Sequence, residues 1–303
     1  MPFFSIIIPF YNNADTICEA IDSVRKQTIE DWECILINDY SEDHTDQLVK
    51  KINEEDSRFR WMNNTQKKGG NICRNIGIKE SKGQYLVFLD ADDLLAEQCL
   101  ETRKYHIHNN NGVELLISHT SIIKNTVDNI TGVIRCSPDS YEQLISSFIK
   151  HRILWTTTGA TWEKDFLLTL NGWNEKYPRL QDVELNIRAL MHKPAMSYTS
   201  MGDSYYRMNN FSKKKKYLAL IGFNLILRDY YEPLITGASN DAESELYGDA
   251  FQNAIMNIIN YFMDMQDENV DEWKAYFMDT LKMINLDNED LIKVFNCIYY
   301  NTD

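Results

Sequence analysis

The segment Gln84-Tyr-Leu-Val-Phe-Leu89 runs without a break into Asp90-Ala-Asp-Asp93, and this junction is the strongest pointer to the fold. A short run of apolar residues rich in aromatic and branched side chains is typical of a strand buried on both faces. Three carboxylates within four residues repel one another unless a cation or hydrogen-bond donors neutralise them. Such oxygen ligands suit Mg²⁺ or Mn²⁺ shared with substrate phosphates; the alternative is an acidic helix N-terminus, favoured by the helix dipole.

Similar apolar runs recur on both sides of this segment, and helical patterns separate them. The predicted strands are 3–8, 33–37, 58–62, 84–89, 113–118 and 155–162. The predicted helices are 14–26, 46–53, 71–80, 97–108, 141–150, 164–170 and one starting near 181, and everything after 212 has a helical pattern. Strands that alternate with helices indicate an α/β fold with a mostly parallel sheet flanked by helices. We expect two domains, 1–211 and an all-helical region 212–303.

Polar clusters follow three of the predicted strands. They are Pro9–Asn13, Asn38–Ser41 and Asp90–Asp93. In parallel sheets of α/β proteins, ligands bind beyond the carboxyl ends of the strands. The sequence therefore predicts that these three clusters line one binding site.

A glycine-containing segment, Gly69 to Gly77, precedes and opens one predicted helix. Glycines before a helix let backbone N–H groups approach an anion, and Arg74 lies one turn further on, where it can pair with a phosphate or a base edge. The alternative is a tight turn followed by an ordinary helical arginine. Neither a G-x-x-x-x-G-K-[ST] phosphate loop nor a G-x-G-x-x-G fingerprint occurs, which disfavours a P-loop NTPase and a dinucleotide dehydrogenase.

Asp182 is the third candidate for chemistry, at the predicted start of a helix. It is either an N-terminal cap or a carboxylate placed as a general base at a cleft. The six histidines share no metal-ligand spacing, and no Ser/His/Asp or Cys/His pattern appears.

The chain carries a formal charge of −14, which is spread unevenly. Residues 232–303 hold fifteen acidic and three basic residues, so the rest of the chain is almost neutral. This distribution excludes a general nucleic-acid binder, which would show a basic face. The six cysteines form no C-x-x-C pair and are typical of reduced thiols in a cytoplasmic protein.

Taken in order, these features resemble those of the family 2 inverting glycosyltransferases of the GT-A fold. The resemblance covers about residues 1–211. It rests on Ser5-Ile-Ile-Ile-Pro9-Phe-Tyr11-Asn12, Ile37-Asn38-Asp39-Tyr40-Ser41, Gly70 to Gly77, Leu89 to Asp93, and Gly172-Trp173-Asn174-Glu175 followed by Gln181-Asp182. It implies a GT-A-like, Rossmann-type sheet for this part of the chain.

The resemblance also implies roles for individual residues. Asp39 would hold the nucleotide base, usually uracil, in a pocket that Pro9 and Tyr11 also line, and Arg74 would lie near the base and the phosphates. The other implied roles are Asp90 at the donor nucleotide, Asp92 and Asp93 at a diphosphate-bound Mn²⁺ or Mg²⁺, Arg207 at the leaving diphosphate, and Asp182 as the catalytic base.

We therefore expect a metal-dependent inverting glycosyltransferase that moves a sugar from a nucleotide-sugar donor to a hydroxyl group. The implied acceptor is a glycan or a lipid-linked oligosaccharide of capsule or O-antigen type. Gln181 stands where the family usually has Glu, so a non-catalytic binder of nucleotide sugars or partners is one alternative. A nucleotidyltransferase is another, although its basic, glycine-rich loop is missing after the first strand.

The expected location is the cytoplasm, with peripheral contact at the inner face of the cell membrane as a further possibility. Such contact would come from 213–228, where the lysine run Lys213–Lys216 precedes the apolar stretch Leu218–Leu227. The alternative, which we favour, is that this stretch is a core helix packed on the catalytic domain. The sequence gives no indication of the oligomeric state.

Overall fold

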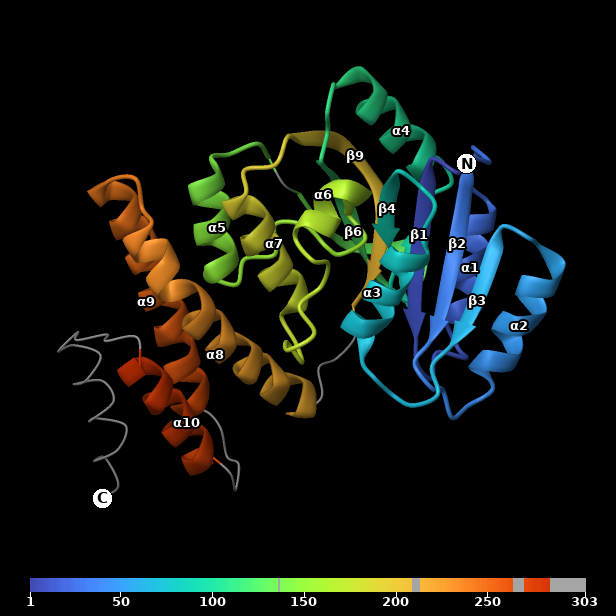
Figure 1. Ribbon diagram of the computed structural model, residues 1–303. Coiled ribbons are helices and arrows are strands. Elements are labelled where there is room, and N and C mark those ends of the chain that lie inside the picture. The colour runs from blue at the N-terminus through green and yellow to red at the C-terminus, as the bar shows by residue number, and fades with distance from the viewer. Residues whose placement is uncertain (136, 209–212, 264–269, 284–303) are drawn as a thin grey trace. The chain divides into compact units, whose positions relative to one another are not determined.

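The computed structural model describes residues 1–135, 137–208, 213–263 and 270–283 (Figure 1). The chain divides into two compact units. The N-terminal unit comprises 1–139, 153–176 and 185–210, and the C-terminal unit comprises 140–152, 177–184 and 211–303. Two short segments that precede residue 212 thus group with the C-terminal helices.

Four strands of the N-terminal unit pair in parallel, in the order β3-β2-β1-β4. They are β1 (Phe4–Phe10), β2 (Trp32–Asn38), β3 (Phe59–Asn63) and β4 (Tyr85–Phe88). All residues of β2 and β4 are buried. Continuous apolar runs form these strands because helices cover both faces of a parallel sheet, so neither face of the strand meets water.

The rest of the sheet is largely antiparallel, so the sheet is mixed and not mostly parallel as predicted. Beyond β4 lie β8 (Ala160–Glu163), β6 (Leu115–Lys124), β9 (Met196–Arg207) and β5 (Leu94–Leu95), and β7 (Thr126–Ile134) pairs with β6. β8 runs antiparallel to both β4 and β6, whereas β6 and β9 are parallel. The sequence did not predict β7 or β9. Most of β7 is exposed, so it lacks the apolar run by which the buried strands were identified.

The side chains of β1 point alternately to the two faces of the sheet, and helices cover both faces. Ile6 and Ile8 join a hydrophobic cluster with Ile17 on one face, while on the other face Ile7 packs against Gly77. The helices of this unit are α1 (Ile17–Arg25), α2 (Thr45–Glu55), α3 (Gly70–Glu80), α4 (Cys99–Asn109) and α6 (Lys164–Thr169). A Cβ atom at position 77 would lie 2.4 Å from Cγ2 of Ile7, so only glycine allows α3 to approach the sheet this closely.

A buried ion pair attaches β9 to α4. The Arg103 guanidinium donates to both carboxylate oxygens of Asp203, at 2.8 and 2.7 Å, and also to the carbonyl of Thr158 at 2.9 Å. Arg103 is fully buried, so these partners satisfy charges that water cannot reach. The pair fixes the position of β9 beside the candidate site.

The C-terminal unit is helical. It contains α5 (Tyr141–Ile149), α8 (Lys213–Thr236), α9 (Asp241–Met263) and α10 (Val270–Met283), and α7 (Gln181–Met191) begins in it. Helix α9 packs against α5 and α8, and α10 packs against α8. None of the described helices is long and apolar enough to cross a membrane.

The apolar stretch Leu218–Leu227 lies in α8 and is mostly buried, with Phe223, Ile226 and Leu227 at or below 1% exposure. This burial agrees with the interpretation of the stretch as a core helix. The side chains of 213–217, which include the lysine run invoked for membrane contact, lie outside the described residues.

Two glycine-to-alanine substitutions test how closely α3 packs on the sheet. Gly77→Ala should lower the free energy of unfolding by about 1–2 kcal/mol, because overpacking at Ile7 outweighs the helix propensity gained. Gly248→Ala in α9 is the matched control, because nothing lies within 4 Å of its added Cβ. It should raise the unfolding free energy by about 0.5–1 kcal/mol. Urea unfolding measures both, and equal effects at the two positions would contradict the packing.

Candidate functional site

The carboxyl ends of β1, β2 and β4 lie next to one another, as the sequence predicts. Phe10 pairs with Asn38 at the ends of β1 and β2. On the other side of β1, the Leu89 N–H donates to the Ile7 carbonyl at 3.0 Å, directly before the acidic cluster. The three polar clusters therefore leave the sheet at a single edge.

Side-chain hydrogen bonds join the loops that follow β1 and β2. The Asn12 N–H donates to Oγ of Ser41 at 3.1 Å, and the Glu42 N–H donates to Oδ1 of Asn12 at 2.8 Å. The Asn13 N–H donates to Oγ1 of Thr45 at 3.0 Å. These bonds between residues about thirty positions apart hold the two loops as one wall of the site.

Tyr11 lies in this wall, and Pro9 lies next to it near the end of β1; both are half-buried. The ammonium group of Lys67 lies 3.2 Å from the centre of the Tyr11 ring, a cation–π contact that brings the loop before α3 against the loop after β1. The wall thus has an aromatic surface next to a cation.

Asp39 is buried and binds the loop that leads into α3. Its Oδ1 accepts the Lys68 N–H at 2.7 Å, and its Oδ2 accepts the Gly69 N–H at 2.9 Å. Gly69 has a φ of 99°, a left-handed conformation that glycine adopts without strain. Burial and the nearby Asp39 charge raise the pKa of the Cys73 thiol, close beneath this loop, to about 12, so Cys73 stays protonated.

Arg74 is buried in the first part of α3 and points at the acidic cluster. Its Nη2 donates to Oδ1 of Asp90 at 2.6 Å, and its guanidinium lies 4.6 Å from the centre of the Trp173 ring. Nε and Nη1 have no hydrogen-bond partner among the described residues, although Arg74 is only 6% exposed. A buried donor without an acceptor is costly, so this guanidinium has the property expected of a group that binds an anion.

The acidic cluster separates into two half-buried carboxylates and one buried carboxylate. Asp90 and Asp92 are half-buried, whereas Asp93 is 2% exposed. Oδ1 of Asp93 accepts a hydrogen bond from the Arg207 N–H at 2.9 Å. Its Oδ2 accepts one from the Thr158 hydroxyl at 3.4 Å. Burial and the charge of Asp90 raise the pKa of Asp93 well above its ordinary value. Asp93 therefore ties the turn to β9, and its predicted role as a metal ligand stays a prediction.

The Arg207 guanidinium binds groups of the protein in this structure. Its Nε donates to the Asp92 carbonyl at 2.9 Å, its Nη1 donates to the carbonyl of Asn125, and its Nη2 donates to Oε2 of Glu19 at 2.6 Å. Each guanidinium nitrogen thus has an acceptor within the protein. In this arrangement Arg207 orders the acidic turn, and its predicted role at the leaving diphosphate stays a prediction.

Asp182 belongs to the C-terminal unit, whereas the other predicted site residues belong to the N-terminal unit. It is half-buried and lies in the first turn of α7, which begins one residue earlier, at Gln181. The positive end of the helix dipole favours the ionised carboxylate there. An N-terminal cap would precede the helix, so this position argues against the capping alternative, and the role of general base stays a prediction.

The donor set at the acidic turn was tested for its fit to a divalent cation. Among the described residues, no group of three or more His, Cys, Asp or Glu side chains is arranged to hold a metal. Asp90 and Asp92 fit a more open type of site, because Mg²⁺ is commonly held by one or two carboxylates and takes its other ligands from substrate phosphates and water. Arg74 already neutralises one oxygen of Asp90, so the candidate ligands are the other oxygen of Asp90 and the carboxylate of Asp92.

Sequence reasoning missed two residues of this network, Trp173 and Glu19. Trp173 supports Arg74, and its carbonyl accepts Nδ2 of Asn75 at 2.9 Å. It stands in one of the motifs quoted above, which was a signal for a role in the site. Glu19 lies on α1, and no pattern in the sequence connects it with Arg207, 188 positions away.

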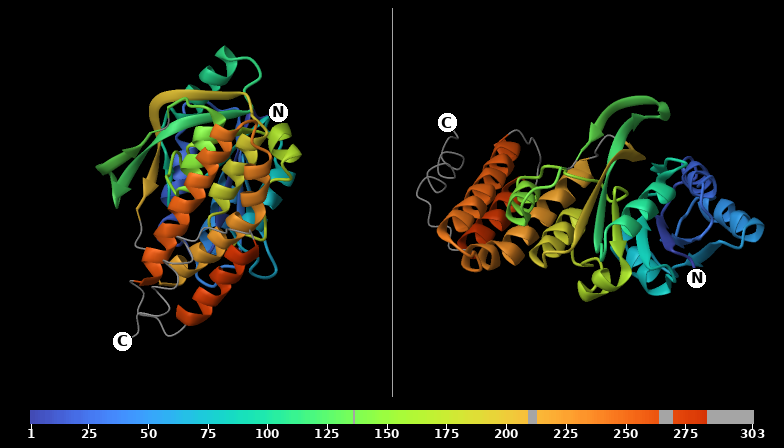
Figure 2. Two further views of the ribbon diagram at one scale, coloured as in Figure 1. Left: turned by 90° about the vertical axis from the view of Figure 1, so that its left-hand side faces the viewer. Right: turned by 90° about the horizontal axis from the view of Figure 1, so that it is seen from above.

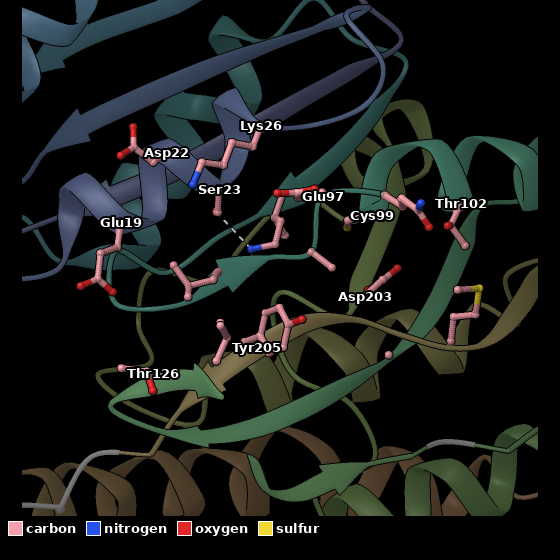
Figure 3. Close-up of a pocket in the computed structure, with 17 residues that line it drawn as sticks. Glu19, Asp22, Ser23, Lys26, Glu97, Cys99, Thr102, Thr126, Asp203 and Tyr205 are labelled. Atoms are coloured by element: carbon pink, nitrogen blue, oxygen red, sulfur yellow. Dashed lines mark hydrogen bonds between the residues drawn. The ribbon is translucent and has the colours of Figure 1, made fainter. Parts of the chain in front are cut away.

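A separate groove of about 720 Å³ lies between α1, β5, β7 and β9 (Figure 3). In Figure 3, Glu19, Asp22, Ser23 and Lys26 line one side, and Thr126, Asp203 and Tyr205 line the other. The groove includes none of the predicted site residues. It meets their network only at Glu19.

Comparison with known proteins gives one family and one fold. Residues 5–129 match the model of glycosyl transferase family 2. The UDP-Glc:alpha-D-GlcNAc-diphosphoundecaprenol beta-1,3-glucosyltransferase WfgD of Escherichia coli is 36% identical over 121 residues, which are 40% of this chain and 47% of WfgD. The glycosyltransferase GlyG of Streptococcus pneumoniae is 32% identical over 98 residues, which are 32% of this chain and 33% of GlyG. The chain spans less than two thirds of the length of the curated relatives it matches.

Two solved structures share the fold. S. aureus TarS in complex with UDP-GlcNAc has a TM-score of 0.70 at 17% identity, over 94% of this chain and 82% of that one. The mannosyltransferase PcManGT from Pyrobaculum calidifontis, in complex with GDP-Man and Mn²⁺, has a TM-score of 0.56 at 15% identity, over 100% of this chain and 88% of that one. These similarities confirm the GT-A-type fold, with a helical C-terminal region.

The contacts of Asp39 predict a stability effect that is independent of any ligand. Asp39→Asn replaces one acceptor with an amide NH₂ that faces the N–H groups of Lys68 and Gly69. The free energy of unfolding should fall by about 1–3 kcal/mol, because a buried donor loses its acceptor. Asp22→Asn, in an exposed pair with Arg25, is the control and should change it by less than about 0.5 kcal/mol. Equal urea midpoints for the two variants would contradict the structural role of Asp39.

Proposed function

We propose that this chain, whose residues 5–129 form a glycosyl transferase family 2 domain, is an inverting glycosyltransferase that uses a nucleoside-diphosphate sugar. The observation that carries the proposal is the buried Arg74 guanidinium, two nitrogens of which have no hydrogen-bond partner in the part of the chain that the structure describes. It lies beside Asp90 at the edge where three strands end. At this edge, Arg74 is a cation that can bind a diphosphate. Asp39 is a carboxylate that can bind the nucleotide base, and Asp90 and Asp92 are carboxylates that can bind a metal. We keep 1–211 as the proposed catalytic domain and 212–303 as a proposed helical C-terminal region.

The donor site in this proposal has two parts. Asp39, Pro9 and the wall containing Tyr11 bind the nucleotide base, and the remaining lone pairs of the Asp39 carboxylate accept its N–H groups. Arg74 and the N-terminus of α3 face the diphosphate, since a helix N-terminus and a guanidinium both favour negative charge. Arg207 acts as a positioning residue that fixes the turn carrying Asp90 and Asp92.

The names of the relatives favour UDP as the nucleotide. TarS is described in complex with UDP-GlcNAc and with UDP, and the name of WfgD specifies a UDP-glucose donor. PcManGT is described with GDP-Man and Mn²⁺, which makes a divalent metal plausible for this fold. For this chain we propose a UDP-sugar donor and Mn²⁺ or Mg²⁺ held by Asp92 and the outer oxygen of Asp90.

The proposed reaction is a single displacement at the anomeric carbon. A hydroxyl group is a weak nucleophile, so the Asp182 carboxylate removes its proton as the new glycosidic bond forms. The bond to the diphosphate breaks on the opposite side, and Arg74 compensates for the negative charge that develops there. A cation held by Asp92 would stabilise the same charge. One displacement with one base inverts the configuration without a covalent intermediate.

The proposed acceptor is a hydroxyl of a glycan or of a lipid-linked oligosaccharide, in the synthesis of a capsule or O-antigen type of polysaccharide. The WfgD name contains a diphosphoundecaprenol-linked sugar, which is the support for a lipid-linked acceptor. We place the reaction at the cytoplasmic face of a membrane, because such an acceptor is anchored there. Contact through 213–228 stays a prediction.

Donor binding predicts a nucleotide-specific change in thermal stability. A ligand present at 100 times its dissociation constant adds about 2.7 kcal/mol to the free energy of unfolding. We therefore expect UDP with Mn²⁺ to raise the melting temperature more than UDP alone, and more than GDP, CMP or ADP with Mn²⁺. Differential scanning fluorimetry with this panel measures the effect.

Two variants make the donor test specific. Asp92→Ala should abolish the part of the shift that depends on Mn²⁺, whereas Asp22→Ala, an exposed carboxylate on α1, should leave it unchanged. A chain whose melting temperature responds to no nucleotide does not have the proposed donor site.

The proposed base predicts a loss of turnover without a loss of donor binding. Asp182→Asn should lower kcat on the order of 100- to 10,000-fold, because the amide cannot take the proton. UDP release from UDP-sugars in the presence of a lipid-diphosphate-linked GlcNAc acceptor measures the rate, and the UDP-induced melting shift measures binding. Asp241→Asn, also a first-turn aspartate of a helix, is the matched control and should keep full activity.

The same comparison separates an enzyme from a binding protein. A non-catalytic binder, which Gln181 suggests as the alternative, would show the UDP shift but no UDP release in the unmodified chain. Equal rates for Asp182→Asn and Asp241→Asn would exclude Asp182 as the base.

A further inference from the structure

The segment that leads into α7 is held by α8 within the C-terminal unit. Residues 177–184, which include the proposed base Asp182, group with α8, whereas the other predicted site residues belong to the N-terminal unit. Helix α8 in turn packs against α9 and α10, which Figure 2 shows beside it in orange to red. The C-terminal helices therefore support the segment that carries the proposed base.

Two hydrogen bonds join this segment to adjacent residues of α8. The Tyr177 hydroxyl donates to Oδ2 of Asp229 at 2.8 Å, and the Tyr230 hydroxyl donates to Oε1 of Glu184 at 2.6 Å. Glu184 is fully buried, so water cannot take the place of the Tyr230 hydroxyl there. Hydrogen bonds to carboxylates are stronger than those between neutral groups. The first and last residues of the segment are thus fixed on one helix.

A glycine lets the backbone of α8 approach the same segment directly. A Cβ atom at Gly222 would lie 2.2 Å from the carbonyl oxygen of Arg179, a distance that no side chain tolerates. Glycine inside a helix lowers the stability of the helix relative to alanine, and the close approach explains its presence here. This contact fixes the backbone three residues before Asp182.

Leu180, which lies between this contact and the proposed base, has an unusual backbone conformation. Its φ is 57°, in the left-handed region that leucine seldom adopts. Its carbonyl accepts a hydrogen bond from the Glu184 N–H at 2.9 Å, in the first turn of α7. Such a conformation persists only where the surrounding contacts determine it. Helix α8 supplies contacts on both sides of Leu180, at Arg179 and at Glu184.

The bond between Tyr230 and Glu184 sets the rotation of α7 about its own axis. Successive residues of an α-helix are rotated by about 100°, so Asp182 and Glu184 project about 200° apart around the axis. Because Glu184 is pinned on α8, the Asp182 carboxylate is turned to the nearly opposite face of α7. Loss of the bond would leave this direction free to vary, while Asp182 itself is unchanged.

We propose that Tyr230 and Glu184 are positioning residues of the glycosyl transfer, which hold α7 on α8 in the orientation that directs the Asp182 carboxylate at the acceptor hydroxyl. This inference rests on the proposed function, in which Asp182 is the general base. A base must lie within hydrogen-bond reach of the proton that it removes. A misplacement of about 1 Å can lower a rate about 100-fold. Helix α8 thus contributes to the rate without touching the substrate.

Removal of the Tyr230 hydroxyl from the full chain tests the proposal. Tyr230→Phe should lower kcat about 10- to 100-fold, because the base is misplaced. The KM for the UDP-sugar and the UDP-induced melting shift should stay unchanged, because the donor site is intact. A melting curve of each variant shows that it is folded at the assay temperature.

Tyr231→Phe is the matched control for this variant. Tyr231 is the next residue of α8, its ring packs against Phe251, and its hydroxyl has no hydrogen-bond partner among the described residues. Its removal should therefore leave kcat unchanged.

The Asp182→Asn background shows whether Tyr230 acts through the proposed base. In that background Tyr230→Phe should leave the residual rate unchanged, because the group that Tyr230 positions is already lost. A merely structural role would lower the rate by the same factor in both backgrounds.

Amide hydrogen exchange tests the positioning without any substrate. In Tyr230→Phe, the Glu184 amide should exchange at least about tenfold faster than in the unmodified chain, because the first turn of α7 opens more often. Tyr231→Phe should leave this exchange rate unchanged.

Three outcomes would overturn this inference alone. They are equal kcat values for the two phenylalanine variants, equal losses in the two backgrounds, and an unchanged exchange rate at Glu184 in Tyr230→Phe. The absence of UDP release from the unmodified chain would overturn the proposed function, and with it the role of Tyr230 and Glu184. The exchange rates distinguish the two failures, because they require no turnover.

Discussion

The parallel register of β1 with β2 and β4 is the constraint on which the candidate site depends. Because the three strands end at one edge, the loops that follow them meet without any long connection. The close contact of Gly77 with Ile7 holds α3 against the same strands, and this places Arg74 beside the acidic turn. The groups of the site are thus positioned by the sheet, and the loops supply the side chains.

Much of this arrangement could be predicted from the sequence, for a physical reason. Strands buried on both faces must be apolar throughout, so the runs at β1, β2 and β4 are visible without any structural information. The polar residues that follow such runs necessarily lie at the carboxyl edge of the sheet. The positions of Asp39 and Asp90 follow from these two facts.

The rest could not be predicted, because it depends on contacts between distant parts of the chain. β7 is mostly exposed and lacks an apolar run, so it can be identified as a strand only from its pairing with β6. Asp92 and Asp93 are neighbours with the same chemistry, and only the position of β9 directs Asp93 inward, toward the Arg207 N–H. The local sequence marks Asp182 only as an acidic residue at a helix start, so the choice of a base over a cap rests on the resemblance, and its place in the C-terminal unit has no signature in the local sequence.

The contacts of Arg207 also bear on the order in which a nascent chain can acquire its structure. The residues of β1, β2, β4 and the acidic turn leave the ribosome first, and their parallel pairing requires nothing beyond residue 88. The turn lacks its ties to Arg207 until more than a hundred further residues have been synthesised, because this one residue binds the Asp92 carbonyl, the Asp93 carboxylate and Glu19. During translation, the framework of the sheet therefore precedes the finished acidic turn, and β9 is the last strand that the turn requires.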